Sequence, residues 1–206
     1  MIEPTEFHSL KCCIVGSCGV GKTTIINKYL HKNTENTETT LGAIFWTFEH
    51  TTENGNNLKL DFWDTAGQER YNSLIPMYSR NSDIVILTYD IADKHSFKEL
   101  DKWISTVSQY NNTCDYIVIG NKIDKKIFRQ IFEEDVNKFI KKNRKLNIKY
   151  IETSAINGEN ISELFEIIFE IGNKRCKKIK KEKNSNIIRH QRIINPKNTY
   201  KCCPIL

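Results

Sequence analysis

The chain has 206 residues, enough for one domain of ordinary size followed by a tail. No stretch approaches the roughly 20 apolar residues of a transmembrane helix, and residues 1–8 lack the basic and then apolar layout of a signal peptide, so we expect a cytosolic protein. The net charge of +6 is uneven, because residues 174–206 have eleven Lys and Arg against one acid, while residues 1–173 have a net charge of −4. A tail this basic can bind nucleic acid or an anionic membrane surface.

The first strong pattern follows a short apolar run. Leu10–Val15 predicts a buried strand and Thr24–Leu30 the start of a helix, and between them Gly16–Thr23 fits the pattern G-x-x-x-x-G-K-[ST]. A strand, a glycine loop and a helix N-terminus direct backbone N–H groups and the positive end of a helix dipole at one point, which favours a polyphosphate. In this arrangement Lys22 reaches the β- and γ-phosphates and the Thr23 hydroxyl holds Mg²⁺. The alternative is a chance glycine turn, which the flanking strand and helix disfavour.

Strand-like and helix-like runs then alternate. Residues 32–39 are wholly polar and predict a mobile loop, and the runs 45–48 and 58–63 flank the hairpin signal Asn54-Gly55. The later runs predict a strand at 84–89, a helix at 96–110 with Phe97, Leu100, Ile104 and Val107 on one face, a strand at 116–119, a helix at 133–143, a strand at 148–153 and a closing helix marked by Ile161, Leu164, Phe165, Ile168 and Phe169. This alternation indicates an α/β domain with a mainly parallel sheet and one antiparallel edge pair. From Lys174 the composition predicts a disordered tail.

The seven cysteines suggest by their spacing neither a metal site nor a disulfide framework. Cys12 and Cys13 fall in the first strand, where we expect at least one of them to be a small buried hydrophobic residue. Cys114 opens a later strand, and we expect it to be structural as well.

A second motif, Asp64-Thr-Ala-Gly67-Gln68, follows the strand at 58–63. A carboxylate at this strand end, opposite the phosphate loop, can hold the Mg²⁺ shell, and Gly67 lets the backbone donate an N–H group to a γ-phosphate. Gln68 can orient an attacking water molecule. Taken alone, Asp64 could also be a strand-end cap.

A third motif, Asn121-Lys122-Ile-Asp124, follows the strand at 116–119. A carboxylate here accepts hydrogen bonds from N1–H and the 2-amino group of guanine, a pair that adenine lacks, so the site discriminates against adenine. Such a tetrapeptide occurs easily in a chain rich in Asn and Lys, but its place at a strand end indicates guanine binding.

Together these motifs resemble the Ras superfamily of small GTPases. The matching stretches are Gly16–Thr23, Thr40-Leu-Gly42, Trp63–Glu69, Asn121–Asp124 and Thr153-Ser-Ala155, and a closer resemblance to the Rab family rests on Leu41–Phe45, Gln68–Tyr71, Tyr89-Asp-Ile91 with Ser96-Phe97, and the terminal cysteine pair. The resemblance implies a P-loop NTPase G domain over residues 1–173, with a mainly parallel six-stranded sheet, one antiparallel edge strand pair and helices on both faces. Residues 174–206 are then a basic hypervariable tail ending in a prenylation motif.

The resemblance also implies a role for each matching residue. It makes Gln68 the catalytic residue, Thr23, Thr40 and Asp64 the Mg²⁺-binding residues, and Phe45, Trp63 and Tyr78 the effector-binding aromatics, whose alternative role is plain core packing. The implied residues that bind GTP or GDP are Ser17, Cys18, Gly19, Val20, Gly21, Lys22, Thr23, Thr24, Thr40, Asp64, Gly67, Asn121, Lys122, Asp124, Ser154, Ala155 and Ile156.

Three positions depart from the family pattern. Residues 32–39 contain no aromatic ring to stack on the guanine, and the nearest ring is His31. Ile156 stands where the family usually has a lysine that packs near the nucleotide. Cys18 occupies the loop position that faces the γ-phosphate; we favour a tolerated small residue there over a reactive thiol. Because base stacking contributes about 1–3 kcal/mol at other sites, we hypothesise that GDP is held less tightly and exchanges faster than in typical relatives.

The last residues, Cys202-Cys203-Pro-Ile-Leu206, resemble a C-a-a-X box of the geranylgeranyl type. The adjacent cysteines suit the double geranylgeranylation that the Rab resemblance implies, and two lipid chains anchor stably. We therefore expect the basic tail to meet a membrane and not nucleic acid, at the cytoplasmic face of endomembranes, with a cytosolic inhibitor-bound pool. Thr40–Phe45 and Pro76-Met-Tyr78 resemble the early-endosome branch, whereas Ser73–Pro76 resembles the Golgi branch; we favour the endosomal one.

The function that follows is a switch that cycles between GTP and GDP and recruits effectors to membranes in vesicle trafficking. We expect slow intrinsic hydrolysis, since no catalytic arginine is evident, and four kinds of regulator: an exchange factor, a GTPase-activating protein, a GDP-dissociation inhibitor and an escort protein. The alternative is a membrane-tethered guanine-nucleotide-binding adaptor with little effective hydrolysis. A P-loop kinase is disfavoured, because no phosphate-acceptor site accompanies the guanine motif.

Overall fold

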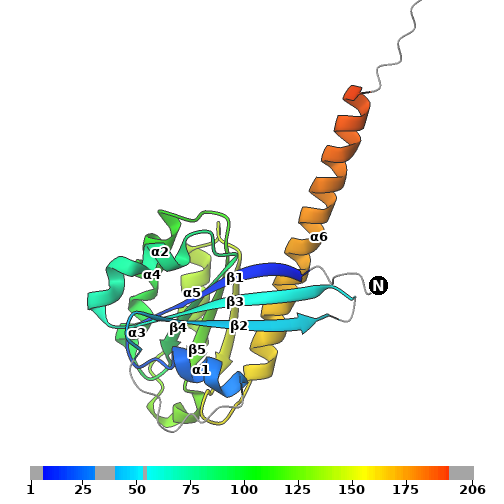
Figure 1. The fold of residues 1–206 in the computed structure, drawn as a ribbon. Coiled ribbons are helices and arrows are strands. Elements are labelled where there is room, and N and C mark those ends of the chain that lie inside the picture. Colours follow the sequence, from blue (N-terminus) through cyan, green and yellow to red (C-terminus); the bar gives the residue numbers. More distant parts are fainter. Residues whose placement is uncertain (1–6, 31–39, 53–54, 195–206) are drawn as a thin grey trace, which may run out of the picture.

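The computed structural model describes residues 7–30, 40–52 and 55–194 (Figure 1). Within these residues six strands form one sheet in the order β2-β3-β1-β4-β5-β6. The strands are β1 (Phe7–Val15), β2 (Ala43–Thr51), β3 (Asn57–Thr65), β4 (Ile84–Asp90), β5 (Asp115–Asn121) and β6 (Ile148–Thr153). β2 and β3 pair antiparallel at one edge, and all other neighbours are parallel. The predicted six-stranded, mainly parallel sheet with one antiparallel edge pair is therefore confirmed.

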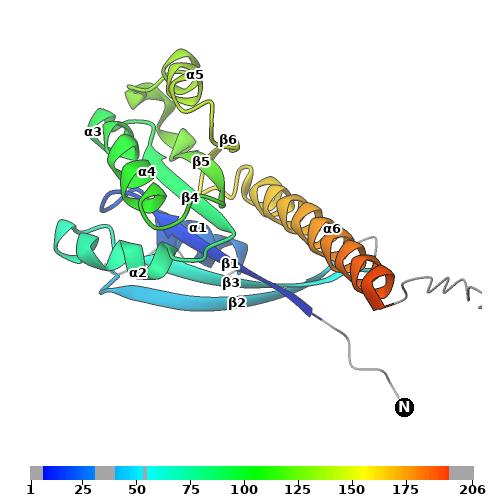
Figure 2. The same ribbon diagram turned by 90° about the horizontal axis from the view of Figure 1, so that it is seen from above.

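Helices cover both faces of this sheet (Figure 2). They are α1 (Lys22–Tyr29), the 3₁₀ helix η1 (Glu69–Leu74), α2 (Ile75–Ser79), α3 (Lys94–Lys98), α4 (Leu100–Ser108), the 3₁₀ helix η2 (Ile123–Phe128), α5 (Glu133–Lys142) and α6 (Ile161–Ile194). Because side chains alternate along a strand, β1 supplies both cores. Cys12 and Ile14 pack with α1 and α6, while Cys13 and Val15 pack with α2, α4 and α5. Both cysteines are thus buried hydrophobic residues.

The parallel arrangement brings the carboxyl ends of five strands to one edge of the sheet. There the phosphate loop follows β1, Asp64 lies near the end of β3, and Asn121 and Thr153 end β5 and β6. In open α/β sheets, ligands bind at this edge, outside the carboxyl ends of the strands. The three sequence motifs therefore meet at one end of the fold.

The helix predicted over residues 96–110 differs in its limits. The structure divides it into α3 and α4, with a turn at Glu99. The Asp93 side chain accepts a hydrogen bond from the backbone N–H of His95 at 2.9 Å, and this cap starts the helix before Ser96.

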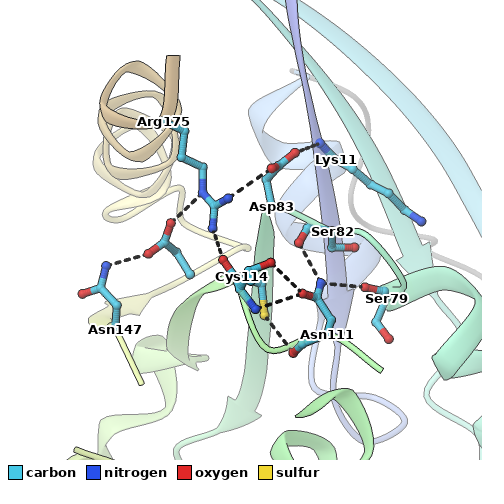
Figure 3. Close-up of polar contacts among 10 residues, drawn as sticks. Lys11, Ser79, Ser82, Asp83, Asn111, Cys114, Asn147 and Arg175 are labelled. Carbon is cyan, nitrogen blue, oxygen red and sulfur yellow. Dashed lines mark hydrogen bonds and ion pairs between the residues drawn. The ribbon is translucent and has the colours of Figure 1, made fainter. Parts of the chain in front are cut away.

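The tail also differs from the prediction of disorder from Lys174, because α6 continues to Ile194 (Figure 1). Two residues beyond Lys174 belong to the folded domain: Cys176 is 1% exposed in the core, and Arg175 binds the starts of β4 and β5 (Figure 3). The buried face of α6 extends from Phe169 past Gly172, which lies against Leu10 and Leu58, to Cys176, and lysine-rich segments have good helix propensity. Within the described part of the chain, no helix combines the length and apolarity needed to cross a membrane.

Candidate functional site

The phosphate loop connects β1 to α1, as the sequence predicts. Gly21 precedes α1 with a φ of 99°, a left-handed conformation that glycine adopts without strain. A Cβ atom at Gly21 would collide with the side-chain amide of Asn121. The glycine therefore also lets the guanine motif approach the phosphate loop.

Lys22 is buried and folds back over its own loop. Its Nζ atom donates hydrogen bonds to the carbonyl oxygens of Gly16 at 2.8 Å and Ser17 at 3.0 Å. Burial lowers the pKa of Lys22 to about 8, although the charge of Asp64 acts in the opposite direction. The loop thus holds a cation where the pattern predicts contact with the β- and γ-phosphates.

Three oxygen-bearing side chains from separate segments converge beside Lys22. Thr23 Oγ1 donates a hydrogen bond to Asp64 Oδ2 at 2.6 Å and lies 2.9 Å from Thr40 Oγ1. Because a hydroxyl has one hydrogen, the Thr40 hydroxyl is the donor in the second contact. Residues predicted to bind Mg²⁺ are therefore already in mutual contact.

Asp64 is fully buried, and burial raises its pKa to about 6 against the opposing hydrogen bond from Thr23 and the charge of Lys22. Its Oδ1 atom has no hydrogen-bond partner among the described residues. A buried carboxylate oxygen without a partner is costly unless something binds it. Hydroxyl and carboxylate oxygens are the donors that Mg²⁺ prefers, so this cluster fits that ion.

Gly67 lies directly against the phosphate loop. A Cβ atom at this position would collide with Lys22 Nζ, the Ser17 carbonyl oxygen and the Cys18 nitrogen. Only glycine allows this approach, which puts the backbone of the second motif beside the phosphate end of the site. The neighbouring Gln68 is half-buried, and its carbonyl oxygen accepts a hydrogen bond from the backbone N–H of Tyr71 at 3.0 Å.

Asn121 joins three loops at the guanine end of the site. Its Nδ2 atom donates to the Val20 carbonyl oxygen at 2.8 Å, so it ties β5 to the phosphate loop. Its Oδ1 atom accepts from Thr153 Oγ1 at 3.1 Å and from the backbone N–H of Ala155 at 3.2 Å. Asn121 therefore holds these three loops together, and Thr153 supports it, a role that the motif Thr153-Ser-Ala155 does not by itself assign.

Asp124 and Ser154, predicted to recognise and support the guanine, are in direct contact. Ser154 Oγ donates to Asp124 Oδ1 at 2.5 Å and accepts from the backbone N–H of Asn157 at 3.1 Å. Lys122 adopts a φ of 69°, and its ammonium group pairs with Asp90 at 2.8 Å. The Ser154 hydroxyl thus orients the Asp124 carboxylate. The ion pair between Lys122 and Asp90 was not predicted from the sequence.

Two of the unusual positions lie at the surface. Ile156 is 58% exposed, and its carbonyl oxygen accepts a hydrogen bond from Lys28 of α1 at 2.8 Å. A lysine from another element therefore reaches the loop where the family's own lysine is missing. No sequence signal pointed to Lys28. Cys18 is exposed at the outer turn of the phosphate loop.

The three predicted effector-binding aromatics form one cluster of adjoining rings across β2, β3 and α2. The ring centroids of Phe45 and Trp63 are 5.2 Å apart, and those of Trp63 and Tyr78 are 5.4 Å apart. Phe45 is 51% exposed, whereas Trp63 and Tyr78 are half-buried. The cluster thus joins the edge hairpin to α2 and presents the Phe45 ring to solvent.

Several predicted features lie outside the described residues. These are His31, the polar run at 32–39, the turn residue Asn54 and the terminal pair Cys202 and Cys203. The missing stacking ring and the lipid anchor therefore stay predictions.

Comparison with known proteins places this site in a family. The Ras family model matches residues 11–173. The chain is 30% identical over 201 residues to Ras-related protein Rab-13 of Bos taurus, covering 95% of this chain and 96% of that protein, and matches Rab-13 of Mesocricetus auratus to the same extent. It is 36% identical over 156 residues to the putative ras-related protein Rab-5B of Dictyostelium discoideum, covering 75% of this chain and 71% of the relative.

These matches span the sheet and all three motifs, and the structure brings those motifs together as a nucleotide-binding G domain requires. Members of this family bind guanine nucleotides, hydrolyse GTP, and work with regulators and effectors in general. The chain belongs to the Ras family and, within it, to the Rab-like small GTPases of vesicle trafficking.

Proposed function

We propose that this chain hydrolyses GTP slowly at the edge of the sheet and signals to effectors only in the GTP form. The observation that supports this most directly is the contact between Thr23, Thr40 and Asp64, beside the buried Lys22. These residues join the phosphate loop, the segment before β2 and the end of β3. A γ-phosphate placed there would contact all three segments, so each of them would lose contacts when hydrolysis removes it.

Each residue has a separate task in this proposal. Lys22 neutralises the β- and γ-phosphates, and the backbone N–H groups of Thr40 and Gly67 bind the γ-phosphate. Thr23, Thr40 and Asp64 would hold Mg²⁺, which would supply positive charge against the phosphates. Gln68 orients the attacking water, and Asp124 selects guanine with support from Ser154 and Ala155.

The remaining nucleotide contacts are proposed from the same geometry. The backbone of residues 17–21 and the first turn of α1, which contains Thr24, surround the phosphates, since this loop and helix N-terminus direct N–H groups at one point. Lys122 and Ile156 flank the base. The cluster of Phe45, Trp63 and Tyr78 is the proposed effector surface, because it bridges β2, β3 and α2, which lie beside Thr40 and Gly67.

The partners proposed are those that a slow switch requires. An exchange factor loads GTP, and a GTPase-activating protein raises the hydrolysis rate about 10³-fold to 10⁵-fold. A GDP-dissociation inhibitor and an escort protein shield the prenylated tail. Lipid chains on Cys202 and Cys203 and the basic tail direct the protein to the cytoplasmic face of endosomal or Golgi membranes, with a cytosolic inhibitor-bound pool.

Single-turnover hydrolysis of bound GTP tests this proposal, with and without a catalytic domain of a Rab GTPase-activating protein. We expect slow wild-type turnover that the activating domain accelerates, and loss of the acceleration in Gln68→Leu. Gln109→Leu, at the exposed end of α4, is the matched control and should behave as wild type. If the wild-type chain bound GTP but did not hydrolyse it under either condition, the adaptor function would replace this one.

A further inference from the structure

Behind the guanine-binding loops, four side chains form an unbroken chain of hydrogen bonds. The Oη atoms of Tyr89 on β4 and Tyr150 on β6 are 3.1 Å apart, and Tyr150 Oη donates to Glu152 Oε1 at 2.7 Å. Arg129, which follows η2, donates from its two terminal nitrogens to the two carboxylate oxygens of Glu152, each at 2.7 Å. We call these four residues the tyrosine–arginine network.

The network has one possible hydrogen-bond direction. Tyr150 gives its only hydroxyl hydrogen to Glu152, so it must accept a hydrogen bond from Tyr89. Burial raises the pKa of both tyrosines, and both phenols therefore keep their protons. Tyr89 is fully buried, and the paired side chains of Arg129 and Glu152 are 19% and 27% exposed. Two-pronged ion pairs of this kind are among the stronger polar contacts in proteins.

A glycine on the central strand makes the network possible. Tyr89, Gly120 and Glu152 are direct neighbours across β4, β5 and β6. A Cβ atom at Gly120 would lie 2.7 Å from Tyr89 Oη, so any larger residue there would force the Tyr89 ring to move. Because Gly120 has no side chain, the phenol of Tyr89 crosses over β5 and reaches the hydroxyl of Tyr150.

The network is connected to three segments, each of which contains a guanine-site residue. Gly120, on which Tyr89 packs, immediately precedes Asn121. Arg129 directly follows η2, which contains Asp124, and its guanidinium also donates to the Ile131 carbonyl oxygen at 3.1 Å. Glu152 lies two residues before Ser154, and its carbonyl oxygen accepts a hydrogen bond from Asn160 Nδ2 at 2.8 Å. The network thus connects all three segments without itself belonging to the predicted nucleotide contacts.

We propose that the tyrosine–arginine network is a positioning device that sets the geometry of the guanine-binding residues, and thereby sets both guanine selectivity and the rate of nucleotide release. This inference rests on the proposed guanine site. Asp124 can bind N1–H and the 2-amino group together only if its carboxylate is held in one orientation. That orientation depends on the Ser154 hydroxyl. The ion pair between Arg129 and Glu152 joins the segment of Asp124 to that of Ser154 and so holds these two residues at a constant spacing.

The test uses the full chain loaded with a fluorescent GDP analogue, and compares GDP with inosine diphosphate, which lacks the 2-amino group. Arg129→Ala should raise the GDP release rate about tenfold, equivalent to about 1.4 kcal/mol, and should narrow the preference for GDP over inosine diphosphate. Tyr150→Phe removes one hydroxyl and keeps the ring, so we expect a smaller change in the same direction, about threefold. Because this variant loses little packing, it remains informative even if Arg129→Ala folds poorly.

Arg175→Ala is the matched control. Arg175 also binds two carboxylates and a backbone carbonyl, those of Asp83, Asp115 and Thr113, but at the opposite ends of β4 and β5 (Figure 3). We expect Arg175→Ala to lower the free energy of unfolding while leaving GDP release and the GDP preference at wild-type values. The proposal is overturned if Arg129→Ala and Tyr150→Phe keep the wild-type preference, or if Arg175→Ala narrows it equally. A wild-type chain that binds both diphosphates equally would instead refute the guanine site on which the proposal rests.

Discussion

Asp64 is a buried charge of the binding site, and we expect it to reduce the stability of the nucleotide-free protein. The carboxylate is fully buried, and one of its oxygens has no partner within the described residues. Replacing this charge with a neutral amide should remove the cost of burying it. We expect Asp64→Asn to raise the free energy of unfolding of the nucleotide-free protein by about 1–3 kcal/mol at neutral pH, while abolishing the Mg²⁺ dependence of GDP retention.

Urea unfolding in the presence of a chelator, together with GDP release at varied Mg²⁺, measures both effects. Asp83→Asn is the comparison, because the Asp83 carboxylate pairs with Arg175 and accepts from the Lys11 backbone N–H. That variant should lose stability. If Asp64→Asn also lost stability, the binding-site origin of the buried charge would be wrong.

The second residue-scale prediction concerns nucleotide retention. Ile156 is exposed, and its backbone carbonyl oxygen accepts a hydrogen bond from Lys28. We expect Ile156→Lys to slow GDP release about threefold to tenfold, because a lysine there would pack against the nucleotide and the phosphate loop. The same release assay measures this, with Ile127→Lys on exposed η2 as control. Equal release in wild type and Ile156→Lys would contradict the hypothesis that this position loosens the nucleotide.

At the scale of the element, α6 shows where the folded domain ends. Cys176 is buried in the core, and Arg175 donates to acceptors before and within two central strands. A chain ending after residue 173 should therefore be less stable than one ending after residue 178 by about 2–5 kcal/mol. Urea unfolding of the two GDP-bound truncations checks this. Equal midpoints would mean that the domain ends at residue 173, as the composition predicts.

The end of β6 should respond to acid. Burial alone would raise the pKa of Glu152, but hydrogen bonds from Arg129 and Tyr150, with Lys126 nearby, outweigh it and hold the pKa below its usual value of 4.5. A carboxylate with a lowered pKa stabilises the folded state above its unfolded pKa, and this stabilisation is lost as the pH falls through the folded value.

We therefore expect wild type to be more stable than Glu152→Gln at pH 7, with the difference shrinking below about pH 4.5. Chemical unfolding between pH 7 and pH 3 measures it. A constant difference across this range would show that the charge of Glu152 does not contribute.

At the scale of the whole molecule, charge and chemistry are separated. The mildly acidic domain has the nucleotide site at one edge of the sheet, whereas α6 leads away from it into the basic tail (Figure 1). Attraction between the tail and anionic lipid is screened by salt, but a lipid anchor is not. Replacing both Cys202 and Cys203 with Ser should therefore move the protein from membrane to soluble fractions, with any residual membrane binding lost at high salt. Salt-resistant membrane binding of this double variant would refute the anchor.

Much of the fold could be predicted because its signals are local. The phosphate loop at Gly16–Thr23 is recognised from its own pattern with a strand before it and a helix after it, and the continuous apolar run 84–89 is typical of a central strand. Element limits were harder, since the start of α3 depends on the Asp93 cap and the end of the folded part of α6 depends on contacts with distant strands. The contacts of Lys28, Asp90 and Arg129 could not be predicted, because their partners Ile156, Lys122 and Glu152 are far away in the sequence.

The sequence by itself determined the family, the sheet and the ligand class, since glycine loops, strand-end carboxylates and apolar periodicity depend on neighbours within a few residues. Only the tertiary structure decided which side chains hold the site together. Parallel strands put Asn121, Asp64 and Thr153 at one edge, and the bare backbone of Gly120 lets Tyr89 reach Tyr150. These contacts depend on distances between strands far apart in the chain, and those distances exist only once the sheet has formed.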